Sequence, residues 1–339
     1  MPGYIHQPVY FFYGSYLYIT DTGNNKIKKI DTNGNVTTVA GSTAGYADGI
    51  GSAAKFNNPS GLVVDNAGVI FVADYANNCI REINGTVVTT FAGVGGVSGD
   101  LLGAAATAKF NRPTDLCVDP QGNMYVTDQI NNKVKVISGG MVTLLAGSGT
   151  QASVDGTGAG ASFYKPAYIG IDLYHGTVFV TEWFTNKVRH IDVAGGVVTT
   201  LTGTGASGNT DGALNVATFY SPYGMCVDNT GNLYIGDKLN NVIRKISAND
   251  VGINENTEIA GLSIFPNPTV NSFKIQNDAN EPVDVISIYN MNGTLVKQLK
   301  LEFYTAPVGI DISELASGTY WIEAVFTNGK ISVGRIIKD

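Results

Sequence analysis

The chain has 339 residues and a formal net charge of −7, with an isoelectric point near 5.0. Phosphate binding needs a basic face, so this charge balance argues against a nucleic-acid partner. Hydrophobic residues make up 44% of the sequence and charged residues only 14%, and there are 42 glycines. This profile suits short strands joined by glycine turns, and tracts with helical spacing are missing. We therefore expect an all-β fold.

The amino-terminal segment carries no recognisable targeting signal. Met1 to Gln7 has no basic region, and Val9 to Tyr18 looks like a repeat strand rather than an apolar signal core. No stretch approaches the roughly 18 apolar residues of a membrane-spanning helix, so we expect no transmembrane segment. If the protein is exported, a signal peptide is missing from this chain, and we expect the chain to be an N-terminally truncated piece.

A repeat dominates the chain as far as Ser247. Short apolar segments end in an acidic residue, and consecutive acids are 53 to 55 residues apart. Each acid is followed by an Asn pair, or its relic Thr185-Asn186, and then by a basic alternating segment such as Lys133 to Ile137. Four copies also carry an earlier Pro-x-x-apolar-x-x-Asp element. The recurring acids are Asp21, Asp74, Asp128, Glu182 and Asp237.

Each period predicts four antiparallel strands. Gly61–Asp65 is nearly all apolar and should be buried on both faces. After an Asn-Ala-Gly turn come Val69–Ala73 and Cys79–Ile83, and the alternation in the latter predicts one solvated face. Val87–Ala92 is the fourth strand. Four strands ordered from buried to exposed describe one blade of a β-propeller.

The repeated elements resemble the NHL repeat family. They are Pro-x-Gly-apolar-Val-Asp, then Gly-x-apolar-Tyr-Val-Ala-Asp, an Asn-rich turn and Ile-Arg-Lys-Ile, and they cover roughly Tyr4 to Ser247. The resemblance implies an NHL-type propeller with five recognisable four-stranded blades. The first copy has a degenerate inner strand around Pro8–Phe12, and the last copy stops after its third strand. We therefore expect an arc of a six-bladed ring, with a five-bladed ring as the alternative.

The repeat ends at residue 247, and a different unit follows. Residues 248–258 are polar and without periodicity, which indicates a linker. Residues 259–339 contain about seven short strand-like segments with tight turns, the size of a small β-sandwich. We therefore expect a propeller over residues 1–247, this linker, and a C-terminal sandwich.

The C-terminal unit resembles the type A sorting domain of the Bacteroidetes type IX secretion system. The residues that carry the resemblance form the Pro-Asn-Pro opening, a Tyr-Asn-x-x-Gly turn, a Leu-x-x-Gly-x-Tyr segment and a basic end. They are Pro266, Asn267, Pro268, Gly293, Leu315, Gly318, Tyr320 and Lys338. The family implies contact with the type IX machinery, passage through the periplasm, cleavage near the linker, and release or attachment at the cell surface. An ordinary appended sandwich is the alternative.

The sequence gives little support for catalysis. Six-bladed relatives include metal-dependent lactonases and lyases, but His6, His175 and His190 form no ligand spacing with one another. The recurring acids suit a structural task, because an Asp at a strand end accepts hydrogen bonds from turn amides. We expect no metal and no cofactor. Calcium at the Asp-Gly-x-Gly loops is the alternative, although these loops lack dense oxygen ligands.

The loops after the strand-two acids differ between blades and carry the candidate ligand contacts. Glu182 replaces Asp in the fourth blade and is followed by two aromatic residues, Trp183 and Phe184, while Tyr75 offers another aromatic side chain. Asp115 and Tyr168 stand near the axis where other blades have glycine. The alternative is that Trp183 and Phe184 pack under neighbouring loops.

Together these features favour a secreted or cell-surface binding or scaffold protein without catalysis, whose propeller face holds a protein or glycan. The alternatives are an axis-centred lyase, lactonase or glycan-active enzyme, and a structural surface-layer component. Among the three cysteines, Cys117 and Cys226 hold equivalent repeat positions and are expected to be buried core residues.

Overall fold

The computed structural model describes residues 10–13, 15–172, 176–228, 231–247, 262–265, 269–277, 282–290, 295–300, 308–327 and 331–338. The chain divides into an N-terminal unit, Met1–Val251, and a C-terminal unit, Gly252–Asp339. Apart from 3-10 helices of three residues each, the regular secondary structure of the described residues is all strand, as expected for an all-β protein. Within it, no helix has the length and apolar character needed to cross a membrane. The predicted linker, residues 248–258, lies outside the described residues.

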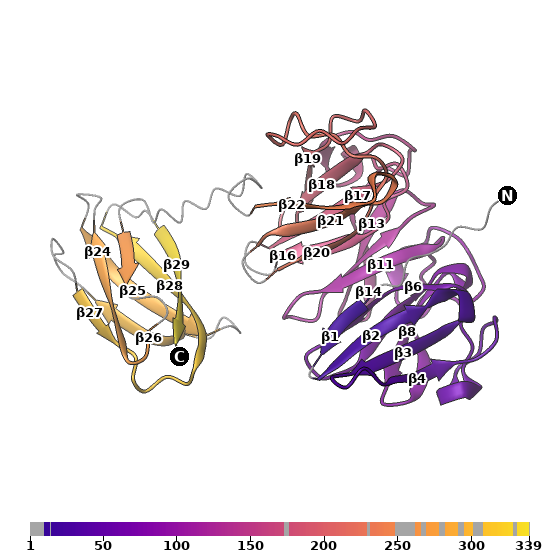
Figure 1. Cartoon of the computed structure of the whole chain (residues 1–339), viewed down its shortest axis with the longest axis horizontal. Helices are drawn as coiled ribbons and strands as arrows, with labels where there is room; N and C mark the ends of the chain where they lie inside the picture. The colour runs from indigo at the N-terminus through magenta and orange to yellow at the C-terminus, as the bar shows by residue number, and fades with distance from the viewer. Residues whose placement is uncertain are drawn as a thin grey trace. The chain divides into compact units, whose positions relative to one another are not determined.

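The N-terminal unit holds five antiparallel sheets in its described residues, one for each repeat (Figure 1). The first sheet runs from β1 to β4, drawn in indigo, and the last from β20 to β22, drawn in orange. The strands of the first two sheets are β1 (Tyr10–Tyr13), β2 (Tyr16–Asp21), β3 (Lys26–Asp31) and β4 (Val36–Gly41), then β6 (Pro59–Val64), β7 (Ile70–Asp74), β8 (Cys79–Asn84) and β9 (Val87–Ala92).

The next three sheets repeat this order. Their strands are β11 (Pro113–Val118), β12 (Met124–Asp128), β13 (Lys133–Ser138) and β14 (Met141–Ala146), then β16 (Ile169–Asp172), β17 (Thr177–Glu182), β18 (Lys187–Asp192) and β19 (Val197–Thr202), then β20 (Pro222–Val227), β21 (Leu233–Asp237) and β22 (Val242–Ile246). The first strands of successive sheets contact one another, β1 with β6, β6 with β11, β11 with β16 and β16 with β20. They are therefore the inner strands of propeller blades.

The two residues of the Asn pair have different structural roles. In the second blade, Asn77 donates its side-chain amide to the Asp74 carboxylate at 2.8 Å. Asn78 adopts φ 57°, a left-handed conformation that Asn tolerates, and so ends the turn. The Asn78 side-chain oxygen then accepts a hydrogen bond at 2.9 Å from the backbone N–H of Arg112, in the next blade. Asn25, Asn132 and Asn186 make the same bond to the blade that follows each of them.

Three features of the blades differ from the expectations. The connection before each of the three middle blades adds a two-residue outer strand, β5 (Gly49–Ile50), β10 (Gly103–Ala104) and β15 (Gly156–Thr157). The third strand has no solvated face at Arg81, whose side chain is fully buried. Cys226 is exposed rather than buried, because no described sheet covers β20 as the fourth blade covers Cys117.

The C-terminal unit packs two antiparallel sheets around one core. One sheet has the order β23 (Leu262–Phe265), β24 (Ser272–Asn277) and β27 (Val308–Asp311). The other has the order β26 (Leu295–Lys300), β25 (Val283–Asn290), β28 (Gly318–Phe326) and β29 (Ile331–Lys338). Phe273, Ile286, Ile322 and Ile336 from both sheets share the core. This is the small β-sandwich that the sequence predicts.

The sorting-domain residues that the structure describes lie around β28. Leu315 packs against the core, Gly318 begins β28 with φ 153°, and the Tyr320 hydroxyl donates to the Ala316 carbonyl at 2.8 Å. Lys338 ends β29 opposite Gly318 and is buried. Pro266, Asn267, Pro268 and Gly293 lie outside the described residues.

Candidate functional site

The residues that vary between repeats, which include the candidate ligand contacts, lie at one end of each blade. In the strand pairing, Pro59 lies opposite Asp74, Pro113 opposite Asp128 and Pro222 opposite Asp237. The start of the inner strand and the end of the second strand therefore lie at the same end of each blade. We call this end of the blades, with the turns that follow the acids, the loop face.

The recurring acids at the loop face belong to a hydrogen-bond network, and the acid is fully buried in every blade except the first, where Asp21 is partly exposed. Asp74 accepts hydrogen bonds from the backbone N–H of Asn57 and the side chain of Asn77, both at 2.8 Å, and pairs with Arg81 at 3.0 Å. Arg81 also pairs with Asp48 in the connection before the blade, at 2.6 Å. Burial raises the pKa of Asp74 to about 6, although Arg81 and the hydrogen bonds favour its charged form.

Other blades repeat this network, so the acids have the structural task that their recurrence indicates. The equivalent ion pairs are Asp21–Lys28 at 2.6 Å, Asp128–Lys135 at 2.6 Å, Glu182–Arg189 at 3.0 Å and Asp237–Arg244 at 3.2 Å. Glu182 is fully buried and also accepts from the Tyr164 N–H at 2.5 Å and the Ser153 hydroxyl at 2.6 Å. Its place in the structure corrects the ligand-contact role predicted for it.

Trp183 and Phe184 form an aromatic ridge on the loop face together with Tyr164 and Tyr223. Phe184 is 43% exposed and stacks on Tyr164, with ring centroids 5.2 Å apart and planes 10° apart. Trp183 lies 4.3 Å from the Phe184 ring and meets Tyr223 edge-on at 6.0 Å. Trp183 is half-buried and packs against the cluster of Ala167, Tyr168 and Tyr223. The pair therefore packs on its neighbours and still leaves apolar surface at the loop face.

Tyr75 lies on the loop face of the second blade, in the turn after Asp74. Its hydroxyl donates to the side chain of Gln129 at 3.4 Å, and Arg112 lies 5.5 Å from the centre of its ring. Burial raises the pKa of Tyr223, and the nearby Tyr75 adds to this effect. Through Gln129 and Arg112, Tyr75 contacts the third blade.

Asp115 and Tyr168 lie deeper, between the inner strands. Asp115 is 5% exposed and accepts a hydrogen bond at 3.1 Å from the N–H of Ile169, in the next blade. A Cβ atom on Gly61, in the preceding blade, would lie 2.0 Å from the other carboxylate oxygen, so Asp115 needs glycine there. Burial raises the pKa of Asp115 to about 7. Asp115 is in no ion pair within the described residues.

A pocket of about 610 Å³, which we call the loop-face pocket, extends from Asp115 and Tyr168 to the fifth blade. Asp115, Tyr168, Tyr223, Met225 and Lys238 are among the residues that line it. The Tyr168 and Tyr223 rings lie 4.5 Å apart. Of the six predicted ligand contacts, Asp115 and Tyr168 line this pocket with Tyr223, and Trp183 and Phe184 are joined to Tyr223 through ring contacts. Tyr75 lies on the loop face beside Gln129 and Arg112, and Glu182 stays in the buried network.

Sequence reasoning missed Tyr223 and Lys238. In the fifth blade the aromatic residue stands one position after the proline, whereas Asp115 and Tyr168 stand two positions after it. A comparison confined to the second position therefore finds only Gly224. Inspection of both positions after each proline would have found Tyr223, whereas Lys238 stands directly after the strand-two acid Asp237.

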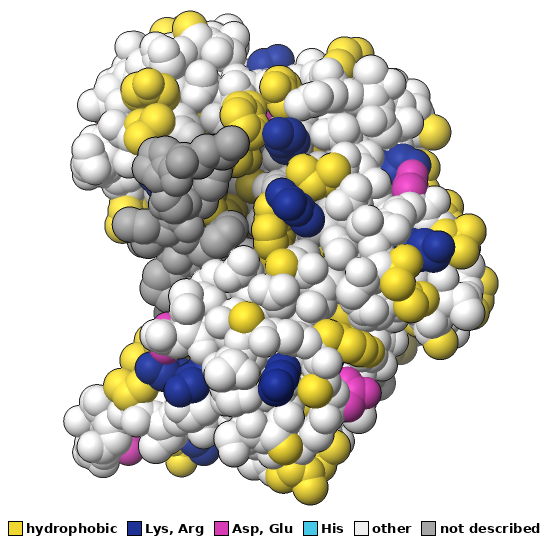
Figure 2. All heavy atoms as spheres, turned by 90° about the vertical axis from the view of Figure 1, so that its right-hand side faces the viewer, with side chains coloured by type: hydrophobic (Ala, Val, Ile, Leu, Met, Phe, Trp, Pro, Cys, Tyr) yellow, Lys and Arg dark blue, Asp and Glu magenta, His cyan; other side chains and the backbone are white. Residues whose placement is uncertain are grey.

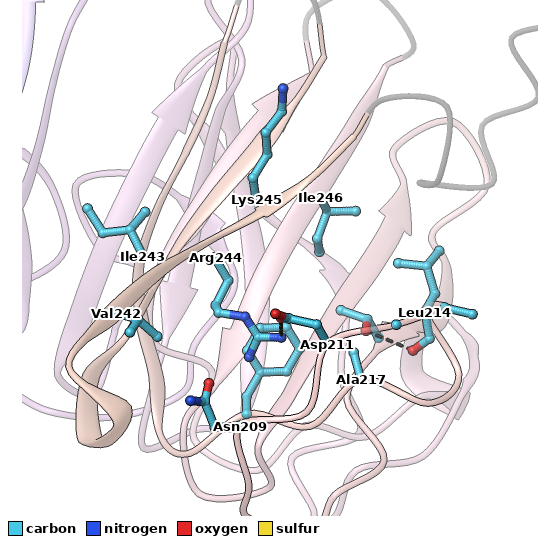
Figure 3. Close-up of a pocket in the computed structure, with 13 residues that line it drawn as sticks. Asn209, Asp211, Leu214, Ala217, Val242, Ile243, Arg244, Lys245 and Ile246 are labelled. Carbon is cyan, nitrogen blue, oxygen red and sulfur yellow. Dashed lines mark hydrogen bonds and ion pairs between the residues drawn. The ribbon is translucent and has the colours of Figure 1, made fainter.

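A second pocket, of about 650 Å³, lies at the outer edge of the fifth blade (Figure 3). Figure 3 shows Arg244 on β22 reaching towards Asp211 in the connection, with Ile243 and Val242 beside it. In the second blade, β9 lies between the equivalent β8 and β5. The pocket thus has the place of a fourth strand, and no candidate ligand contact lines it.

The described residues hold no group of three His, Cys, Asp or Glu side chains placed to bind a metal ion. His190 is half-buried, and its ring nitrogens lie 3.4 Å from the hydroxyls of Thr177 and Thr199. His6 and His175 lie outside the described residues.

Comparison with known proteins agrees with this architecture. Residues 56–83 match the NHL repeat, and residues 263–339 match the secretion system C-terminal sorting domain. The human NHL repeat-containing protein 2 is 25% identical over 321 residues, which cover 67% of this chain and 44% of that protein. SUPPRESSOR OF QUENCHING 1 of Arabidopsis thaliana is 26% identical over 306 residues, covering 68% of this chain and 29% of that protein. The chain thus spans less than half the length of these relatives.

Solved structures share the propeller fold. A chain in the crystal structure of a nidogen/laminin complex superposes with a TM-score of 0.51 and 17% identity, covering 72% of this chain and 76% of that chain. An auxiliary nutrient binding protein from Bacteroides thetaiotaomicron has a TM-score of 0.51 and 16% identity, covering 70% and 68%. At these identities the likeness concerns the fold alone. The chain is an NHL-repeat β-propeller protein that ends in a secretion system C-terminal sorting domain of the Bacteroidetes type.

Proposed function

We propose that the chain is a secreted binding or scaffold module whose loop face holds a protein or glycan partner without catalysis. The sorting domain implies export by type IX secretion to the cell surface or the extracellular space. We propose further that it is cleaved near residues 248–258 and leaves the propeller released or attached to the surface.

The aromatic ridge is the observation that carries this proposal. Tyr164, Phe184, Trp183 and Tyr223 are in continuous ring contact, and they come from two blades. Rigid aromatic side chains with one exposed side supply large contact areas to protein and glycan partners at little entropic cost. An acid and base set poised for catalysis is not among the described loop-face residues, whose strand-two acids are all in ion pairs.

The main alternative is an enzyme centred on the propeller axis. Asp115 favours it, since a buried carboxyl group with a raised pKa is typical of catalytic sites. A bound divalent metal on the axis with three or more side-chain ligands would support this alternative and overturn the proposal.

The test is a double substitution, Trp183→Ala with Phe184→Ala, assayed on a glycan array and by pull-down from the native environment. Tyr16→Ala is the matched control, because Tyr16 is 38% exposed at the end of β2 opposite to Asp21. We expect the double variant to lose binding and the control to keep it. A double variant that loses stability but no binding would instead support a structural surface-layer component.

A further inference from the structure

Three basic side chains at the loop face lie over aromatic rings. Arg112 lies 5.5 Å from the centre of the Tyr75 ring, Lys165 lies 4.8 Å from that of Phe184, and Lys238 lies 4.4 Å from that of Tyr223. None of the three is in an ion pair within the described residues, whereas the basic residues of the third strands pair with buried acids. Figure 2 shows single Lys and Arg side chains lying beside hydrophobic ones on the side that it displays.

These charges favour an anionic partner. The strand-two acids of the loop face are all in ion pairs, so these three basic side chains are cations that remain available there among the described residues. A cation over a ring keeps its charge available to a ligand, because the ring supplies no full negative charge. An anion at this face would therefore gain attraction from three positive groups that have no described counterion.

The Tyr168 hydroxyl is buried and lies near the hydroxyls of Ser60 and Tyr223. The Tyr168 and Ser60 hydroxyls are buried and make no hydrogen bond of standard geometry in the described residues. Asp115, beside them, has one carboxylate oxygen that accepts from Ile169. Buried polar atoms of this kind favour a ligand or water that both donates and accepts hydrogen bonds.

A sugar ring that carries a carboxylate combines these requirements. Its apolar face suits Tyr168, Tyr223 and Trp183, and its hydroxyl groups both donate and accept. An ammonium ligand suits the hydroxyls and Asp115 but meets Lys238 in the pocket lining. An acidic peptide suits the cations but has fewer hydroxyl groups for the deep residues.

We propose that the loop-face pocket binds an acidic saccharide, with a uronic acid residue against the Tyr168 and Tyr223 rings and its carboxylate towards Lys165 and Lys238. This inference rests on the proposed function and specifies its partner. In this arrangement Asp115 and the Tyr168 hydroxyl bind the sugar hydroxyls, and Trp183 supports the Tyr223 ring.

The test measures binding of the purified full chain to uronic acid oligosaccharides of three kinds, from pectin, alginate and glucuronoxylan. Neutral galactose oligomers and poly-glutamate are the comparison ligands. We expect at least one uronate to bind better than both, and its affinity to fall between 50 and 500 mM salt, on the order of tenfold, as attraction between exposed charges does.

Variants then separate the contributions. The double variant Lys165→Gln with Lys238→Gln removes two charge-assisted contacts. It should weaken uronate binding by about tenfold or more and reduce its salt dependence. Tyr168→Phe should weaken binding without changing the salt dependence. Lys29→Gln is the matched control, since Lys29 also lies 4.4 Å from the centre of a tyrosine ring, that of Tyr16 on the first blade. It should bind like the parent chain.

Two outcomes would overturn the inference. Uronates that bind no better than neutral oligomers or poly-glutamate would exclude an acidic saccharide. Uronate binding that survives the double lysine substitution would exclude the assigned site. If a neutral glycan or a protein still binds and Trp183→Ala with Phe184→Ala abolishes that binding, the proposed function stands and only this specification fails.

Discussion

The carboxylate of Asp74 lies 3.0 Å from the guanidinium group of Arg81, and neither side chain has any exposed surface. A buried ion pair stabilises a fold only when further hydrogen bonds satisfy the remaining polar atoms. Here Asn57 and Asn77 bond to the acid, and Asp48 and the carbonyl of Lys55 bond to the terminal nitrogens of the base, whose Nε alone makes no hydrogen bond to the described residues. The pair thus joins the turn, the third strand and the connection into one network, which the other blades repeat.

Removing Arg81 should destabilise the propeller severely. Arg81→Met leaves the Asp74 charge buried without its partner, which typically costs about 3–5 kcal/mol. Glu82→Gln is the control, because Glu82 is the next residue on the same strand and is only half-buried. Its effect should stay within about 0.5 kcal/mol. Urea unfolding followed by tryptophan fluorescence measures both, and equal effects would contradict the role assigned to the pair.

Much of this fold follows from the sequence, because the repeat supplies several independent readings of each strand. The strands, the turn Asn residues and the structural task of the acids could all be predicted. The burial of Arg81 could not, because alternation of charged and apolar residues normally marks a solvated face. In a propeller both faces of a blade can be covered, and the strand-two acid gives the charge a buried partner.

The candidate site was only partly predictable. Asp115 and Tyr168 stood out because they replace glycine at a repeat position, and Trp183 with Phe184 because two aromatic residues follow one acid. Glu182 is the one Glu among Asp residues at its repeat position, which predicts a special role, yet its longer side chain reaches the same network. The approach of Tyr223 to Trp183 depends on packing between blades, and no spacing within one repeat encodes it.

Gly61 and Asp115 should show coupled effects on stability. In Gly61→Ala the new Cβ atom would lie 2.0 Å from the Asp115 carboxylate and 2.6 Å from the backbone of the same residue, so the inner strands must separate. We expect a loss of about 1–3 kcal/mol, as for other overpacked sites. When Asp115→Gly is added to Gly61→Ala, part of the lost stability should return, because the clash with the carboxylate disappears while the clash with the backbone remains. A double-mutant cycle by urea unfolding measures the coupling, and strictly additive losses would refute the close approach of the two residues.

Asp115 should also give the propeller a distinct pH dependence. Its pKa in the fold, about 7, is above the usual 3.8, so the folded state holds the proton more tightly than the unfolded state. The free energy of unfolding should therefore fall as the pH rises from about 4 to about 7, and this contribution should stay constant above that range. At 1.36 kcal/mol for each pKa unit, the change is at most about 4 kcal/mol.

Asp115→Asn isolates this contribution, because Asn still accepts a hydrogen bond from Ile169 but does not titrate. The difference in unfolding free energy between the parent chain and Asp115→Asn should change between pH 4 and 7. Asp74, whose pKa is also raised, is present in both proteins and cancels in the difference. A difference that is independent of pH would show that Asp115 titrates at its ordinary pKa in the fold.

Export should depend on the core of the C-terminal unit. Ile336 on β29 is fully buried in the core that joins the two sheets, whereas Leu295 at the start of β26 is 47% exposed. Ile336→Asp places an unpaired charge in that core, so the sandwich should not fold. Leu295→Asp makes the same chemical change at the surface and should be tolerated. With a signal peptide fused to the N-terminus of each variant, in a host with type IX secretion, immunoblots of the culture medium, outer membrane and periplasm should find Ile336→Asp in the periplasm and Leu295→Asp outside the cell. Export of both variants at the parent level would mean that recognition needs only a linear segment of the domain.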